Sequence, residues 1–313
     1  MVEAWRDLAL EAAWRLFPTR LPVGRLSWPL DPDWLQSTWI AWPSRYQWAP
    51  TRKWVEPLRR ALARLVRVVR TDLPQPYPGI VLIQVVSYGR PRTLAVDCSD
   101  YPVVNGPCAD EVGVYFKMQY RCEGYPWEHV VPGGFVPGDD RIYQFLPRLR
   151  GLATHGAPLF DVYGRFGMQF ASDLRRNAIQ QLAQASQFTY YGGAGTVRYS
   201  RFLREAARAK VCINLPGNGE FCFRLIDYLA VGTGVVGPRP RNRLHVPLVD
   251  RVHVVYTRDD LSDLIPLCQR YVDDRAAREE IGRNARKLFD DFLLSDQLAA
   301  YYLHSCFNAF ATD

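Results

Sequence analysis

The sequence contains no run of 18 or more predominantly apolar residues, so we expect no helix that spans a membrane. Its first residues include Glu3, Arg6 and Asp7 where a secretion signal would carry an apolar core, and we therefore expect a cytoplasmic protein. Its cysteines never form a C-x-x-C pair, and several lie in apolar runs such as the one around Cys212. They are expected to be reduced thiols of a protein core, and not a disulfide framework or a metal site.

The composition is that of an ordinary globular protein. Of the 313 residues, 48% are hydrophobic and 23% are charged, which excludes disorder and is enough for about two domains with a sizeable core. The excess of lysine and arginine over aspartate and glutamate, 39 − 32 = +7, favours an anionic partner. Nucleic acid, a membrane surface and a phosphorylated small molecule all remain open.

Residues 1–150 are predicted to form a first, less regular lobe. A helix over 2–17 is followed by an irregular, tryptophan-rich stretch that reaches to about residue 50. The apolar residues of 54–70 recur at helical spacing with arginines on another face, which indicates a basic amphipathic helix. Anionic lipid could bind there. Strands are predicted over 80–86, 93–97, 113–120 and 128–131, in a sheet of undetermined topology.

Residues 151–313 are predicted to form a second lobe of regular α/β structure. Short apolar strands without polar alternation follow one another with helices between them, which is typical of a parallel, doubly wound sheet. The strands are expected at 159–163, 188–191, 211–215, 234–236 and 252–256, and the helices at 171–185, 199–209, 220–231, 260–272 and 275–292. The last helix, 295–310, is expected to pack back on the first lobe.

Ligands of open parallel sheets bind beyond the carboxyl ends of the strands, so the loops at those ends are the first candidates for a binding site. Pro216, Gly217, Asn218 and Gly219 follow one such strand and lead into the helix expected at 220–231. The glycines allow close approach of the backbone, and the start of the helix offers unpaired N–H groups. A plain turn between strand and helix would need the same glycines.

The predicted helix carries three charged residues that suit an elongated anionic ligand. Glu220 and Asp227 are seven positions apart, which would place both on one helix face where they can meet different hydroxyls, as in a sugar nucleotide. Arg224 can bind phosphate oxygens, and Arg165 in another loop at the same edge adds a second guanidinium. Alternatively, Arg224 and Asp227 form a solvated pair, and Arg165 lies on the surface.

The stretch 210–237, which contains RLIDYLAVGTGVV, resembles the donor-binding half of GT-B glycosyltransferases of the family 1 type, with features of the exostosin and CAP10-like branches. The late stretch HVVYTRDDLSDL (253–264) is similar to the same lobe. The resemblance covers 158 to about 305 and implies two Rossmann-like lobes, with nucleotide sugar in the second and acceptor in the first. Many retaining members have two glutamates eight positions apart, whereas here position 228 is Tyr. Neither retention nor inversion is therefore predicted.

The resemblance also implies roles for individual residues. Arg165 and Arg224 would meet the diphosphate, Asp227 the ribose hydroxyls, and Glu220 or the Asn218–Gly219 backbone the sugar. An inverting enzyme would need a general base from the first lobe, and Asp97 and Asp100 follow a strand there. Lys117 and His129 are candidates for acceptor binding. Aspartates at such positions also form turns, and His129 would then be structural.

We therefore predict a metal-independent glycosyltransferase of the hexosyltransferase type, with a nucleotide-diphosphate sugar as substrate and no cofactor. The only D-x-D, Asp31-Pro-Asp33, lies between tryptophans with no apolar strand of the usual kind before it, so no metal site is predicted. A nucleotide-sugar epimerase or hydrolase of the same fold is one alternative. Another is a non-catalytic nucleic-acid-binding protein that uses the arginines of 59–70, although no nucleic-acid motif is present.

Overall fold

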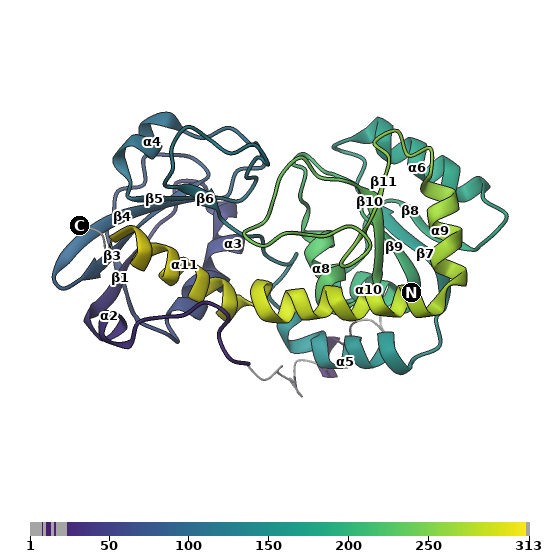
Figure 1. The fold of residues 1–313 in the computed structure, drawn as a ribbon, viewed down its shortest axis with the longest axis horizontal. Coiled ribbons are helices and arrows are strands. Elements are labelled where there is room, and N and C mark those ends of the chain that lie inside the picture. Colours follow the sequence, from purple (N-terminus) through teal and green to yellow (C-terminus); the bar gives the residue numbers. More distant parts are fainter. Residues whose placement is uncertain (1–7, 9–10, 14–15, 17–23, 311–313) are drawn as a thin grey trace. The chain divides into compact units, whose positions relative to one another are not determined.

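A computed structural model describes residues 8, 11–13, 16 and 24–310 of the chain (Figure 1). Contacts divide the described chain into two compact units. The first lobe consists of 24–136, Arg241–Pro247 and 290–310, and the second lobe of Pro137–Pro240 and Leu248–Phe289 with the short described pieces before residue 17. Apart from those short pieces, the helix predicted over 2–17 lies outside the described residues.

The first lobe contains a mixed sheet of six strands in the order β2-β1-β3-β4-β5-β6. The strands are β1 (Thr38–Pro43), β2 (Arg67–Thr71), β3 (Ile80–Ser87), β4 (Arg90–Asp97), β5 (Val114–Lys117) and β6 (Val130–Pro132). β4, β5 and β6 are parallel, whereas β3 pairs antiparallel with both β1 and β4. The carboxyl ends of β4 and β5 therefore meet at one edge, where Asp97 pairs in register with Lys117.

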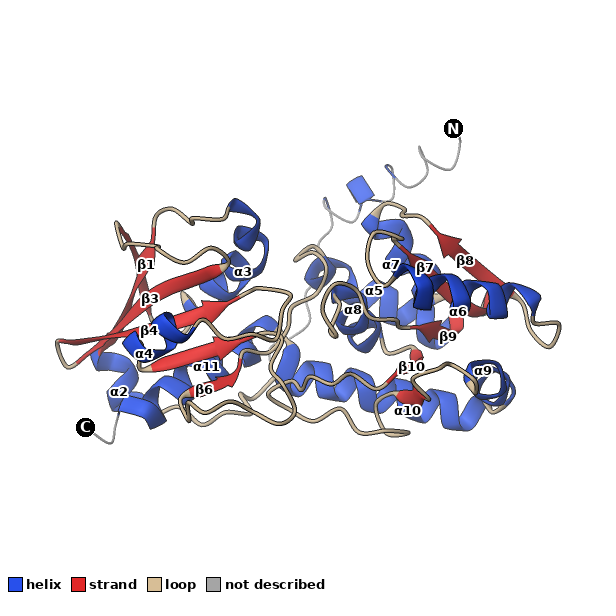
Figure 2. Cartoon of the chain, turned by 90° about the horizontal axis from the view of Figure 1, so that it is seen from above, coloured by secondary structure: helices blue, strands red, loops and turns tan. Residues whose placement is uncertain are grey.

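Helices cover both faces of this sheet (Figure 2). They are α2 (Pro32–Ser37), α3 (Arg52–Leu62), α4 (Gly106–Glu111) and α11 (Ser295–Phe310), and a 3-10 turn, Ala49–Thr51, precedes α3. The long C-terminal helix α11 packs against α3 and β5, and the ring of Tyr302 stacks on Phe116 with 3.8 Å between centroids. Cys108 and Ala109 of α4 pack against Ala95 and Tyr115 on the opposite face.

The second lobe contains a parallel sheet in the order β11-β10-β9-β7-β8. The strands are β7 (Phe160–Phe166), β8 (Tyr190–Ala194), β9 (Ala209–Ile213), β10 (Gly234–Pro238) and β11 (Val255–Thr257). Glycine allows two close approaches within it. A Cβ on Gly192 would lie 2.0 Å from the oxygen of Gly164, and one on Gly237 would lie 1.9 Å from the oxygen of Asn214. The predicted α/β class with two Rossmann-like lobes is confirmed.

Helices on both faces make the second sheet doubly wound (Figure 2). They are α5 (Ile142–His155), α6 (Ser172–Gln184), α7 (Tyr199–Ala207), α8 (Phe223–Val231), α9 (Leu264–Asp273) and α10 (Arg275–Leu288), with a π-helical turn at Phe289–Leu293. α6 and α9 pack on one face, and α5, α7, α8 and α10 on the other. The contact division falls at residue 137, before the boundary predicted near 150, because α5 packs against α7 and α8.

Three local predictions were wrong. The helix expected over 54–70 ends at Leu62, and 67–71 instead forms strand β2. The arginines of this strand were predicted to lie on the polar face of the helix. The stretch 24–50 is not irregular throughout, since it contains α2 and the buried strand β1. The helix expected from Glu220 begins only at Phe223. All seven cysteines have free thiols, and no helix in the described part combines the length and apolar character that crossing a bilayer requires.

Candidate functional site

The strand order of the second lobe identifies where a ligand would bind. From β7 the chain passes first to β8 on one side and then to β9 on the other, so the direction of winding reverses between β7 and β9. The helices that follow these two strands lie on opposite faces, and sheets wound in this way bind ligands at the carboxyl ends of the strands, a place that we call the β7/β9 crevice. Residues 165–167 at the end of β7 and 214–217 after β9 form its two sides.

Arg224, in the first turn of α8, joins the two sides of this crevice. Its Nη1 donates to the oxygen of Arg165 over 2.6 Å, and its Nη2 lies 3.5 Å from the oxygen of Leu215. The guanidinium lies over the ring of Phe166, 4.8 Å from its centroid. Arg224 therefore reaches the crevice as predicted, but part of its hydrogen-bonding capacity is used by the strand ends.

Arg175 of α6 is a second guanidinium at the same place, and sequence reasoning did not find it. Its side chain donates to the oxygen of Pro216 from Nε over 3.0 Å and from Nη2 over 2.6 Å, and Nη1 donates to the oxygen of Gly167. The residue is 5% exposed. Burial, and then the charge of Arg224, lower the pKa of Arg175. In the sequence it looks like one of two ordinary arginines of an amphipathic helix.

The two arginines share one electrostatic property. Within the part of the chain that the structure describes, neither Arg175 nor Arg224 forms an ion pair with a carboxylate, because all their acceptors are neutral backbone oxygens or the sulfur of Cys222. Two like charges are thus held close together at the carboxyl edge of a parallel sheet. A bound anion would neutralise the positive charge of these two arginines, which no carboxylate of the described residues compensates.

The loop after β9 lies beside these arginines. Gly217 N–H donates to the oxygen of Gly219 over 3.0 Å, Asn218 is exposed, and a Cβ on Gly217 would be 3.4 Å from Nη2 of Arg175. Among the described residues, no side chain caps the start of α8. Glu220 lies in this loop and not on the helix, so the prediction that it shares a helix face with Asp227 is wrong.

Asp227 has a defined place inside the lobe. It is 2% exposed, and its Oδ1 accepts from the N–H of Gly138 over 3.0 Å and from the hydroxyl of Tyr199 over 2.7 Å. Burial, and then the charge of Asp227, raise the pKa of Tyr199 well above its usual value. The Asp227 carboxylate therefore connects the segment at Gly138 to α7 and α8. This carboxylate does not lie at the surface of the crevice.

Arg165 lies at the end of β7, which extends to Phe166, and not in a loop. Its guanidinium pairs with Glu205 over 2.7 Å and lies over the ring of Tyr191, 5.0 Å from the centroid. Glu205 also accepts from Arg201 over 2.8 Å and from the hydroxyl of Tyr163 over 3.0 Å. Burial acts to raise the pKa of Glu205, but the bonds from Arg165 and Arg201 outweigh it and lower the pKa.

In the first lobe, Asp97 and Lys117 form an ion pair of 2.8 Å, and their side chains are only 2% and 0% exposed. Asp97 also accepts from the hydroxyl of Tyr115 over 2.6 Å and from the N–H of Ser99 over 2.8 Å. Lys117 also donates to Ser99 Oγ over 2.7 Å. The two predicted site residues are thus brought together, enclosed beneath the ends of β4 and β5.

The other two first-lobe candidates lie at opposite ends of the strands. Asp100 is partly buried in the loop after β4. His129 precedes β6, and because β4, β5 and β6 are parallel it lies at the far edge from Asp97. Its Nε2 is 2.7 Å from the oxygen of Ala109, so it joins β6 to α4. Within the described residues, no group of three or more His, Cys, Asp or Glu side chains could hold a metal ion.

Comparison with known protein families matches residues 174–303 to the glycosyl transferase-like family. No curated protein is similar enough to this chain to be matched. The matched segment begins in α6, next to Arg175, and includes the loop after β9 and the whole of α8 with Arg224. Residues 174–303 are therefore similar to glycosyl transferase-like proteins, and together with the two α/β lobes this match supports a glycosyltransferase of the GT-B type.

Proposed function

We propose that the protein transfers a sugar, of the hexose type, from a nucleotide-diphosphate donor to a hydroxyl acceptor. The observation that carries the proposal is the pair of guanidinium groups, Arg175 and Arg224, which have no carboxylate partner among the described residues and lie at the β7/β9 crevice. A diphosphate is an anion that such a pair can stabilise. The family match over the same residues supports glycosyl transfer as the reaction.

The two arginines would have different tasks. Arg224 is partly exposed and would contact the diphosphate, whereas Arg175 is almost fully buried and would act as a positioning residue that holds Pro216 and Gly167. The backbone of Asn218 and Gly219 would approach the sugar or its phosphate. As the sugar–phosphate bond breaks, negative charge grows on the leaving nucleoside diphosphate, and guanidinium groups already in place would stabilise it. We accordingly propose transfer without a metal or cofactor.

The acceptor hydroxyl must lose a proton, and we propose Asp100 as the base for an inverting reaction. Asp97 is the less suitable of the two carboxylates because Tyr115, Lys117 and the Ser99 N–H already donate to it in a buried place. Asp97 and Lys117 would then fix the end of β4, and with it the start of the loop that carries Asp100.

The test of the donor site is binding of nucleoside diphosphates and their sugars to the full chain. We expect one such compound to raise the melting temperature through mass action, and Arg224→Gln to weaken its binding about tenfold or more. Arg176→Gln is the matched control, since its side chain is 67% exposed and pairs with Asp173 on the outside of α6. If no compound of the panel binds, or if both variants bind alike, the proposed site is wrong.

Products of a labelled donor distinguish transfer from the alternatives on the same fold. Transfer places the label on a hydroxyl acceptor and releases nucleoside diphosphate. A hydrolase would release free labelled sugar at the same rate with and without acceptor, and an epimerase would return the label in a stereoisomer of the donor. Either of these results would contradict the proposed reaction without contradicting the diphosphate site.

A further inference from the structure

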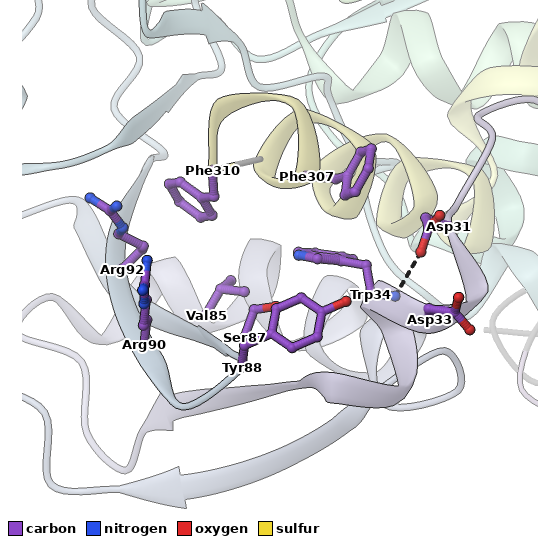
Figure 3. A pocket seen from close by; sticks show the side chains of 10 residues that line it. All are labelled: Asp31, Asp33, Trp34, Val85, Ser87, Tyr88, Arg90, Arg92, Phe307 and Phe310. Atoms are coloured by element: carbon purple, nitrogen blue, oxygen red, sulfur yellow. Dashed lines mark hydrogen bonds between the residues drawn. The ribbon is translucent and has the colours of Figure 1, made fainter. Parts of the chain in front are cut away.

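The first lobe contains a pocket of about 630 Å³ that the proposed reaction does not use. It lies between the β3–β4 hairpin, helix α2 and the last turn of α11 (Figure 3). The lining residues are Asp31, Asp33, Trp34, Val85, Ser87, Tyr88, Arg90, Arg92, Phe307 and Phe310. Its volume is in the range of small-ligand sites.

Aromatic rings form the walls of the pocket. Trp34 and Phe307 meet edge to face with 5.6 Å between centroids, and Phe310 lies over Gly113, where a Cβ would come within 2.7 Å of the ring. Tyr88 closes the side nearest the hairpin turn (Figure 3). Tyr88 is 68% exposed and has a φ of +49°. It lies in a two-residue turn, where Asn or Gly is the usual residue at such a φ. A large exposed ring is therefore held at a position that disfavours it.

Charges of opposite sign occupy the two ends of the pocket. Arg90 and Arg92 lie at one end and Asp31 and Asp33 at the other, with the rings between them (Figure 3). Both arginines are on the same face of β4, where they pair in register with Ser87 and Val85 of β3. One oxygen of Asp31 caps α2 by accepting from the N–H of Trp34 over 2.7 Å, and Asp33 is exposed.

The indole of Trp34 supplies a directed donor. The residue is only 4% exposed, and its ring nitrogen points into the pocket toward the arginine end (Figure 3). No described residue accepts a hydrogen bond from this nitrogen. Because this N–H faces the open pocket, it can donate to an acceptor of a bound ligand.

We propose that this pocket binds a sugar ring that carries an anionic group, as in an acidic saccharide. The C–H face of the ring packs on the aromatic walls, the anion binds Arg90 and the indole N–H, and Asp33 accepts from hydroxyls. The site is separate from the loop that carries the proposed base Asp100, because that loop begins after Asp97, and Arg90 and Asp97 stand seven residues apart along β4, about 23 Å at ~3.3 Å per residue. It does not depend on the proposed donor site in the other lobe.

Titration calorimetry on the full chain tests the proposal with a galacturonic acid trisaccharide, a hexose 6-phosphate and a neutral galactose trisaccharide. The first two probes distinguish a carboxylate from a phosphate as the recognised anion. We expect at least one of them to bind and the neutral probe to bind about tenfold more weakly or not at all. Binding of the neutral probe at the same affinity, or of neither anionic probe, overturns the proposal.

Two variants locate the binding. Arg90→Gln is expected to lower the affinity for the anionic probe about tenfold, because the substitution removes a charge-assisted hydrogen bond. Tyr88→Asn removes the ring while suiting the turn, and is expected to weaken binding about threefold or more. Tyr101→Asn is the matched control, an exposed tyrosine (60%) of the same lobe outside the pocket.

Equal affinities of all three variants, or a preference for phosphocholine over every saccharide, would overturn the assignment. Each variant is expected to bind nucleoside diphosphate as the native protein does. Loss of saccharide binding with unchanged nucleoside diphosphate binding therefore concerns this pocket and not the donor site.

Discussion

Arg224 Nη1 donates a hydrogen bond of 2.6 Å to the backbone oxygen of Arg165, which ties the start of α8 to the end of β7. The same guanidinium reaches toward Leu215 after β9, so one side chain joins both strands of the β7/β9 crevice. Because these acceptors are neutral, the contacts orient the charge without cancelling it. The guanidinium is thereby held in place by the strand ends, which is what electrostatic stabilisation of a leaving group in the reaction that we propose requires.

Replacement of Arg175 tests whether the crevice depends on its second guanidinium. Arg175→Gln loses the bonds to Pro216 and Gly167, and the free energy of unfolding should fall by about 1–3 kcal/mol. Nucleoside diphosphate should bind about tenfold more weakly, because the loop after β9 loses its support. Arg176→Gln, one position further along α6, should change neither quantity. An unchanged denaturation midpoint for Arg175→Gln would mean that its buried bonds contribute nothing.

The second lobe could be predicted from sequence because its signals are local. Apolar strands and amphipathic helices alternate there with short connections, so the element order and the parallel sheet followed directly. In the first lobe, 67–70 continues the helical spacing of α3, yet these residues pair with β1. Whether a short apolar run extends a helix or joins a sheet depends on a partner strand distant in the sequence, and periodicity does not contain that information.

The site was predicted only in part, for the same reason. Arg224 was found because it follows a glycine loop at a strand end. Arg175 was missed because its partners, Pro216 and Gly167, are carbonyls supplied by two other segments. Asp227 and Lys117 carry charges that suggested contact with substrate, but burial turns both toward groups of their own lobe. The sequence therefore indicated the edge of the sheet at which we propose that a ligand binds, but not which side chains are exposed there.

The buried pair of Asp97 and Lys117 predicts a large and non-additive effect on stability. Asp97→Asn leaves the Lys117 ammonium buried without its counter-charge, and Lys117→Met does the same to the carboxylate. Each should lower the free energy of unfolding by about 3–5 kcal/mol. The double variant should lose clearly less than the sum of the two, because no uncompensated charge remains. Urea denaturation of the four proteins measures this, and strict additivity would contradict the pairing.

Glu56 on α3 predicts a loss of stability in strong acid. It accepts from the Tyr46 hydroxyl over 2.7 Å, from Arg59 over 2.8 Å and from Arg70 over 2.6 Å. Burial alone would raise the pKa of Glu56, but these bonds outweigh it and lower the pKa from 4.5 to about 2. Because the folded pKa lies below the unfolded one, the stabilisation is complete above pH 4.5 and is lost as the pH falls toward 2.

Unfolding of Glu56→Gln as a function of pH isolates this contribution. The difference in free energy of unfolding between the native protein and the variant should be constant near neutral pH and should shrink below pH 4.5. Asp33→Asn provides a control for the loss of one exposed carboxylate of the same lobe. A difference that stays the same down to pH 2 would mean that the three hydrogen bonds do not favour the ionised form.

His245 predicts a second acid-sensitive range, at higher pH. Its ring stacks on Tyr301 with 4.4 Å between centroids, its Nε2 lies 3.1 Å from the oxygen of Phe292, and its buried Nδ1 has no partner among the described residues. Burial lowers the pKa of His245 from 6.5 to about 4. Between these values the unfolded chain takes up a proton that the folded protein excludes, so stability falls as the pH decreases from 6.5 to 4.

His245→Phe keeps a ring in this place but cannot bind the proton. The variant should lose the bond to Phe292 at every pH, yet its free energy of unfolding should fall less steeply than that of the native protein between pH 6.5 and 4. An NMR titration of the His245 ring measures the same quantity directly. A midpoint near 6.5 would contradict the prediction, because it would mean that the imidazolium is as well solvated among these rings as in water.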